Sequence, residues 1–182
     1  GTPFNEFIFT QTCTNYSKEL SGMKLLYADM TEEEQEQNKV YMLCSDIIRS
    51  YAFQRATDLY DDMPYSEAGG AFQELFYPKY DTQEEIYMNI METLKNAAAE
   101  LSEYQFQTDA QESKFSSVDI LCNGDLDKWI RMANSLRLRM AMRLCHVKPD
   151  AALSTIKELI AENRMLTEYS HDLGFEEQDK TH

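Results

Sequence analysis

The chain has 182 residues with 32 acidic and 17 basic side chains, which gives a formal net charge of −15, and 43% of its residues are hydrophobic. This length favours one domain with a real apolar core. The acidic balance argues against nucleic acid as a ligand, because phosphate binding needs a basic surface. No apolar run approaches the roughly 18 residues that a membrane-spanning helix needs.

The N-terminal part of the sequence predicts two long helices. Apolar residues recur every three or four positions over residues 5–27, as on one face of a helix. Thr31 can cap a second helix, because the acids Glu32–Glu34 that follow it suit a helix N-terminus. We expect this helix to run from about Glu36 to Tyr60 and to end before Pro64, since the residue before a proline disfavours helix.

A long loop is predicted over residues 61–80, with two prolines, a Gly-Gly pair and five aromatic residues. Flat aromatic faces can stack on a sugar ring or a peptide, so the candidate ligand-binding residues are Phe72, Phe76, Tyr77 and Tyr80. The alternative is that these rings only fasten the loop to the neighbouring helices. Both interpretations stay open at this point.

Three more helices are expected in the C-terminal half. Asp81 or Thr82 caps the third, whose apolar residues run from Ile86 to Leu101. Residues 102–123 are polar and predict irregular structure. The fourth helix follows Gly124-Asp125 and ends near His146, and the fifth covers Ala151 to Asn163. The short turn between the last two predicts an antiparallel helical hairpin, and we expect residues 167–182 to be a loosely held tail.

The fourth helix carries the only tryptophan, Trp129, on its wide apolar face. Arg137 lies beside Ala133, Met140 and Leu144, where a charge must be paired because burying it alone is costly. Asp58, late in the second helix, is the hypothesised partner of Arg137.

No pattern of a catalytic or metal site stands out. Cys13, Cys44, Cys122 and Cys145 lack metal-site spacing and are interpreted as small buried hydrophobes. The carboxylates of Asp58, Asp61, Asp62 and Glu67 could surround a calcium ion, but the calcium-loop pattern is absent and capping bonds are the favoured interpretation. We expect no cofactor, no catalytic residue and no metal ligand, and therefore no enzyme.

The predicted helices follow one another in pairs without a clear strand. This arrangement indicates an all-α, tetratricopeptide-like scaffold of helical pairs, although the tetratricopeptide consensus itself does not fit. We expect residues 1–182 to form a single helical domain.

Three stretches resemble motifs of the SusD/RagB family, and their order along the chain agrees with that family. They are Thr57–Ala68 (TDLYDDMPYSEA), Tyr77–Tyr87 (YPKYDTQEEIY) and Gly124–Arg139, which contains GD, KW and ANSLRLR. Asp61 departs from the usual glycine, and Met132 stands where phenylalanine is typical. The motif residues that the resemblance marks as structural are Asp58, Pro64, Tyr65, Trp129, Asn134 and Arg137.

The resemblance covers about residues 5–165 and only the helical part of much longer proteins, so the chain is expected to be a portion of such a protein. It implies a non-catalytic, nutrient-binding lipoprotein, exposed on the outer membrane. Such a protein captures glycan, or in some members peptide, for a SusC-like TonB-dependent β-barrel transporter. It implies contact with the membrane only through a lipid anchor that this chain does not contain. The alternative is a helical scaffold that binds other proteins and no ligand of its own.

Overall fold

The computed structural model describes residues 3–70 and 77–167, with side chains from residue 6 onward. In this part of the chain the regular elements are helices, and a single antiparallel bridge joins Met63 and Asp81. The all-α prediction is therefore confirmed. None of the described helices is long and apolar enough to cross a membrane.

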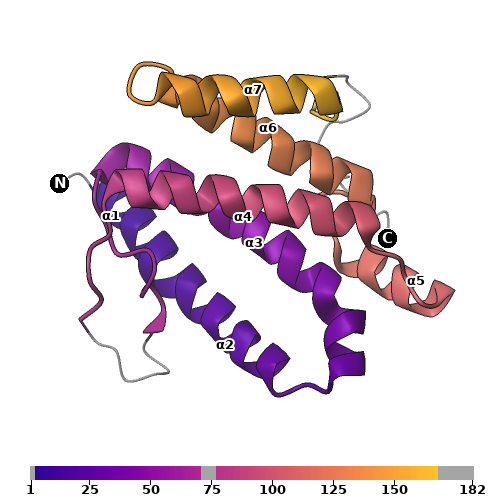
Figure 1. Cartoon of the computed structure of the whole chain (residues 1–182). Coiled ribbons are helices and arrows are strands. Elements are labelled where there is room, and N and C mark those ends of the chain that lie inside the picture. Colours follow the sequence, from indigo (N-terminus) through magenta and orange to yellow (C-terminus); the bar gives the residue numbers. More distant parts are fainter. Residues whose placement is uncertain (1–2, 71–76, 168–182) are drawn as a thin grey trace, which may run out of the picture. The chain divides into compact units, whose positions relative to one another are not determined.

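The chain forms two compact units, residues 1–94 and residues 95–182. The single domain expected over the whole chain stays a prediction. The first unit contains α1 (Pro3–Phe9), η1 (Thr10–Tyr16), α2 (Ser17–Ala28), α3 (Glu32–Tyr60) and residues 83–94 of α4 (Gln83–Glu103). Figure 1 labels the α-helices. The second contains the rest of α4, then α5 (Asp109–Val118), α6 (Leu126–Leu144) and α7 (Pro149–Glu162).

The helix predicted over residues 5–27 is present, but its middle is a π-helix, η1. The Ser17 hydroxyl donates to the Thr12 carbonyl oxygen five residues earlier at 2.7 Å, across this wider turn. The apolar spacing predicts a regular α-helix here and does not indicate the wider turn.

A capping box starts α3 four residues earlier than predicted. The Thr31 hydroxyl accepts from the Glu34 backbone N–H at 3.3 Å, and the Glu34 carboxylate accepts from the Thr31 backbone N–H at 2.9 Å. These bonds from Thr31 hold the pKa of Glu34 below its ordinary value. The acids Glu32–Glu34 are therefore the first turn of the helix and not a connector before it.

The core of the first unit is made by one face of α3 and the N-terminal part of α4. Its fully buried side chains include Val40, Ile47, Phe53, Met63, Ile86 and Ile90. Each such side chain contributes about 1.5–3 kcal/mol on burial.

In the second unit, α5 corrects the prediction of irregular structure for residues 102–123. The Thr108 hydroxyl caps it by accepting from the Gln111 backbone N–H at 3.2 Å, and Phe115 is its buried residue. The sequence of α5 carries no apolar stripe, so the helical period is invisible there.

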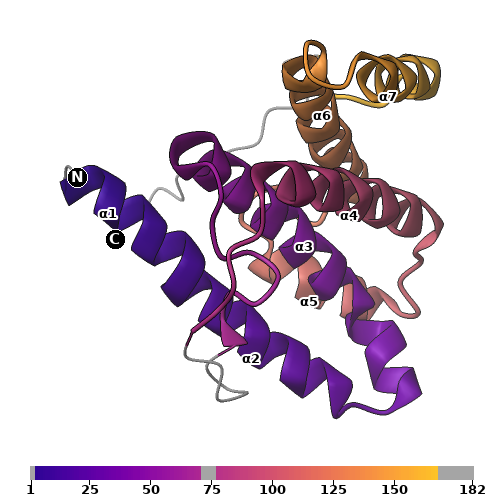
Figure 2. The same ribbon diagram turned by 60° about the vertical axis from the view of Figure 1, so that its left-hand side comes forward.

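The predicted pair of α6 and α7 is confirmed, and the two helices lie side by side in both views (Figures 1 and 2). Ala133, Met140 and Ala141 of α6 and Leu159 of α7 are fully buried. Pro149 opens α7, as suits a residue without a backbone N–H. Asn163 ends it in the left-handed conformation.

Candidate functional site

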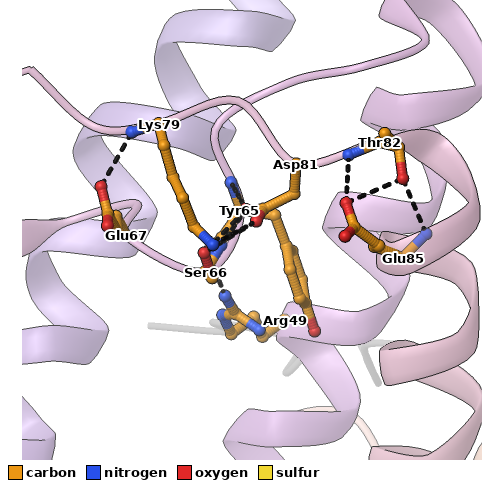
Figure 3. Close-up of polar contacts among 8 residues, drawn as sticks. All are labelled: Arg49, Tyr65, Ser66, Glu67, Lys79, Asp81, Thr82 and Glu85. Carbon is orange, nitrogen blue, oxygen red and sulfur yellow. Dashed lines mark hydrogen bonds and ion pairs between the residues drawn. The ribbon is translucent and has the colours of Figure 1, made fainter.

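The loop that follows α3 is closed by one buried carboxylate, Asp81 (Figure 3). Its oxygens accept from the backbone N–H of Ser66 at 2.7 Å, from that of Tyr65 at 3.2 Å and from the Ser66 hydroxyl at 2.8 Å. The Lys79 ammonium adds an ion pair at 3.3 Å. The backbones of Met63 and Asp81 also exchange both bridge hydrogen bonds, so the two ends of the loop are held together.

The protonation state of Asp81 follows from these contacts. Burial acts to raise the pKa of Asp81, but the hydrogen bonds from Ser66 and Tyr65 and the Lys79 ammonium outweigh it, so the pKa lies below its ordinary value. Asp81 is therefore an ionised structural group at neutral pH. The N-cap of α4 is left to Thr82, whose hydroxyl accepts from the Glu85 backbone N–H at 3.2 Å.

The neighbouring carboxylates serve separate hydrogen bonds. Glu67 accepts from the Lys79 backbone N–H at 2.8 Å, and Asp62 accepts from the Gln83 backbone N–H at 2.9 Å. Asp58 accepts from the Tyr87 hydroxyl and from the Gln54 amide. Within residues 3–70 and 77–167 no three His, Cys, Asp or Glu side chains gather in a way that could hold a metal ion.

Tyr65 and Arg49 join this loop to α3. The Arg49 guanidinium donates to the Tyr65 carbonyl oxygen at 2.8 Å, and its central carbon lies 4.1 Å from the centre of the Tyr65 ring and 4.7 Å from that of Phe53. The Tyr65 hydroxyl donates to Asn89 on α4 at 2.6 Å. Burial raises the pKa of Tyr65, and the positive charge of Arg49 opposes that rise. Sequence analysis did not identify Arg49, because one arginine on a long helix has the same pattern as any solvated charge.

A hollow of about 340 Å³ opens beside these residues, between α2, α3, the loop and α4 of the first unit. Its polar lining includes Ser21, Lys24, Arg49, Tyr65 and Asn89.

Gly69 fixes the loop at the edge of this hollow. Its φ is +80°, and a Cβ added there would lie 2.2 Å from the backbone oxygen of Ser17. Only glycine fits both the conformation and the close approach.

Two of the four predicted aromatic residues lie in the part of the chain that the structure describes. Tyr77 and Tyr80 are 94% and 65% exposed, so neither ring is packed under the helices. Phe72 and Phe76 lie outside the described residues. The exposed pair stays a candidate ligand surface. Pro64, at the start of the loop, is buried, and its carbonyl oxygen accepts from the Cys13 thiol at 3.9 Å.

The hypothesised pairing of Arg137 with Asp58 is wrong. The Arg137 side chain is 4% exposed and pairs with Glu158 of α7 at 2.9 Å, with a longer bond to the Asn134 amide oxygen at 3.3 Å. Lys95 contacts the same Glu158 at 3.2 Å. The Arg137 Nε atom finds no hydrogen-bond partner among the residues that the structure describes. The hairpin turn brings Glu158 to Arg137, and this placement depends on helix packing that the sequence does not show.

Asn134 connects α6 with the chain that follows α7. Its amide nitrogen donates to the Glu162 carboxylate and to the Arg164 carbonyl oxygen, both at 3.0 Å. A second cavity of about 420 Å³ lies beside these residues, within the second unit. Acidic and basic side chains balance along its wall, and they are Lys95, Glu103, Arg137, Glu158, Glu162 and Arg164.

Trp129 is buried, and its indole N–H donates to Asp119 at 2.8 Å. Asp119 also accepts from the backbone N–H groups of Leu121, Cys122 and Gly124. Sequence analysis missed Asp119, although aspartate side chains often accept from backbone N–H groups a few residues further on in turns.

The described helices follow one another in pairs, and in the first unit a polar hollow lies beside the loop residues Tyr65 and Ser66. These features define the class as an all-α scaffold of tetratricopeptide-like pairs. The family model described as "Starch-binding associating with outer membrane" (SusD-like_2) matches residues 4–181, and the chain belongs to this SusD-like family. No curated protein matches the chain.

Solved structures of the same family are similar to the chain. A SusD-like protein of Bacteroidetes AC2a has 30% identity over 86% of this chain, with a TM-score of 0.68. A SusD homologue of Bacteroides vulgatus has 27% identity over 84%, with a TM-score of 0.65. A chitin-binding SusD homologue of Flavobacterium johnsoniae has 31% identity over 74%, with a TM-score of 0.60. The chain spans only 26%, 29% and 27% of these three proteins.

Proposed function

We propose that the chain is part of a non-catalytic nutrient-binding subunit that captures a glycan at the outer membrane. The observation that carries this proposal is the family match over residues 4–181, whose description names starch binding and the outer membrane. The chitin-binding relative, at 31% identity, supports a carbohydrate as the ligand class.

The geometry of the first unit supports binding without turnover. Asp81 ties Tyr65 and Ser66 to the start of α4, and the nearby rings of Tyr77 and Tyr80 are exposed. Exposed aromatic rings can bind ring-shaped ligands at low entropic cost. Among the described residues of this region, the carboxylates of Asp62, Glu67 and Asp81 accept structural hydrogen bonds, and no two of them stand out as the pair that glycoside hydrolysis needs.

The proposed partner is a TonB-dependent β-barrel transporter of the SusC-like class, and the proposed location is the cell surface. The helices would supply the scaffold and the surface for the partner. Peptide is the second ligand class proposed, since some members of the family take peptide.

The test is a glycan and peptide binding screen with the full chain, combined with affinity purification from outer membranes. We expect a glycan to be bound and recovered unchanged, and a β-barrel transporter to co-purify. Replacing both Tyr77 and Tyr80 by alanine is expected to weaken glycan binding without changing the helix content, because both rings are exposed. Binding followed by cleavage would contradict the non-catalytic role.

The alternative, a scaffold for protein contacts alone, predicts that a barrel co-purifies while no glycan or peptide binds. If neither ligand nor barrel were found, both proposals would fail.

A further inference from the structure

Among the described residues, two cationic side chains and no carboxylate line the hollow between α2, α3 and the loop, and the cations are Lys24 and Arg49. The Arg49 guanidinium carries five N–H groups. One of them donates to the Tyr65 carbonyl oxygen at 2.8 Å, and the guanidinium also interacts with the Tyr65 side chain. The centres of the Phe53 and Tyr65 rings lie 4.7 and 4.1 Å from its central carbon, so both rings hold the guanidinium in place at the hollow.

Two further donors face the same hollow. Asn89 uses its amide oxygen to accept from the Tyr65 hydroxyl, and no described residue accepts from its amide nitrogen. Lys24 lines the hollow from α2 and is paired at 3.1 Å with Asp46. An ammonium group has three donors, so this pair does not exhaust it.

The acceptors nearby are already engaged. The Asp81 carboxylate is occupied by Ser66, Tyr65 and Lys79. The Asp46 carboxylate pairs with Lys24 at 3.1 Å. A ligand group that enters the hollow therefore meets N–H donors from Arg49 and Asn89 in particular.

We infer that this hollow is a subsite for a carboxylate group of an acidic glycan, held by the Arg49 guanidinium with help from Asn89 and Lys24. A carboxylate presents two oxygens to a guanidinium edge, and such charge-assisted bonds are among the strong ones. The hollow, about 340 Å³, is of the size of small-molecule sites, which begin at about 300 Å³. The inference rests on the proposed glycan-binding function and adds the ligand class.

The test compares tri-galacturonate with its fully methyl-esterified form, which has the same sugar backbone and no negative charge. Binding to the full chain is measured by calorimetry. We expect the acid to bind at least about tenfold more tightly than the ester, the effect of one charge-assisted contact. Equal affinities, or no binding of the acid, would overturn the inference.

The variants locate the effect. Arg49→Gln is expected to remove the preference for the acid. Because Arg49 also packs against two rings, its fold is checked by circular dichroism. Lys24→Gln is an independent variant, since Lys24 is exposed, and it should weaken binding of the acid about threefold, as befits an exposed charge. Asp46→Asn should strengthen binding of the acid, because a negative charge beside Lys24 is lost.

Lys18→Gln is the matched control, because Lys18 is an exposed lysine of the same helix that does not line the hollow. It should leave the affinity for the acid unchanged. The inference would be overturned if Lys24→Gln and Lys18→Gln lost equal affinity for the acid and Arg49→Gln kept the preference for the acid over the ester. The acid would then bind elsewhere. The proposed function is tested separately, by measuring the binding of neutral glycans such as chitin oligosaccharides and the co-purification of a β-barrel transporter.

Discussion

Two buried polar clusters, one in each unit, satisfy their charges in different ways. Asp81 accepts from two backbone N–H groups, a hydroxyl and an ammonium, and all of its partners lie within 16 positions of it in the sequence. Arg137 depends on side chains alone, chiefly on Glu158 of another helix, and its Nε atom lacks a partner among the described residues. The carboxylate held by the backbone is fully satisfied, whereas the arginine held by side chains is not.

The difference indicates separate roles. Backbone N–H groups cannot leave a loop without unfolding it, so Asp81 fixes the loop that borders the hollow. A side-chain pair between helices orders α6 against α7, but an apolar pair could pack there as well. Substitutions at the two clusters should therefore have unequal effects on the free energy of unfolding.

The largest effect is expected at Asp81. Asp81→Ala leaves the N–H groups of Tyr65 and Ser66 without their acceptor in a buried site, which should lower the free energy of unfolding by about 3–4 kcal/mol. Urea unfolding of the full chain measures this. Asp81→Asn keeps one acceptor oxygen and should lose about half as much, and equal losses for the two variants would show that the hydrogen bonds are not the cause.

The pair in the second unit should respond asymmetrically. Glu158→Ala leaves the guanidinium of Arg137 buried with only the bond to Asn134, and should cost about 2–3 kcal/mol. Arg137→Met removes the charge and keeps the volume, so it should cost less than about 1 kcal/mol. The same unfolding measurement compares them. If Arg137→Met were the more harmful change, the pair would be a net source of stability and the contrast with Asp81 would disappear.

Acid should act on the Asp81 cluster through its pKa. Because the folded pKa of Asp81 is lowered, its contribution is fully present above the ordinary aspartate pKa and is lost as the pH falls below about 4. Unfolding between pH 7 and pH 3 should therefore show a steeper loss of stability for the wild-type chain than for Asp81→Asn. Parallel curves would contradict the lowered pKa.

The smallest effect is expected at the N-terminal caps of α4 and α3, Thr82 and Thr31. Thr82→Ala removes the cap of α4 beside Asp81 and should cost about 1 kcal/mol, and Thr82→Ser should cost much less. Thr31→Ala at α3 is the matched change away from the loop, and a similar loss is expected there. A loss at Thr82 far above that at Thr31 would mean that the cap also supports the Asp81 cluster.

The sequence by itself determined the helices with a clear apolar period, and their caps. Val40, Ile47, Ile86 and Ile90 lie on the faces that their spacing predicts, because burial of such a stripe needs only neighbouring turns of one helix. The family motifs, from Thr57 to Arg139, identified the family for the same reason: they are written in contiguous residues.

The tertiary structure alone decided the partners of polar groups. Glu158 rather than Asp58 pairs with Arg137, and Asp119 holds Trp129, because packing between elements sets these distances. The hollow beside Arg49 likewise exists only where α2, α3, the loop and α4 meet. Local periodicity determines which face of a helix is apolar. The hydrogen-bond partner of a buried polar side chain lies on another element, and only the folded chain brings the two elements together.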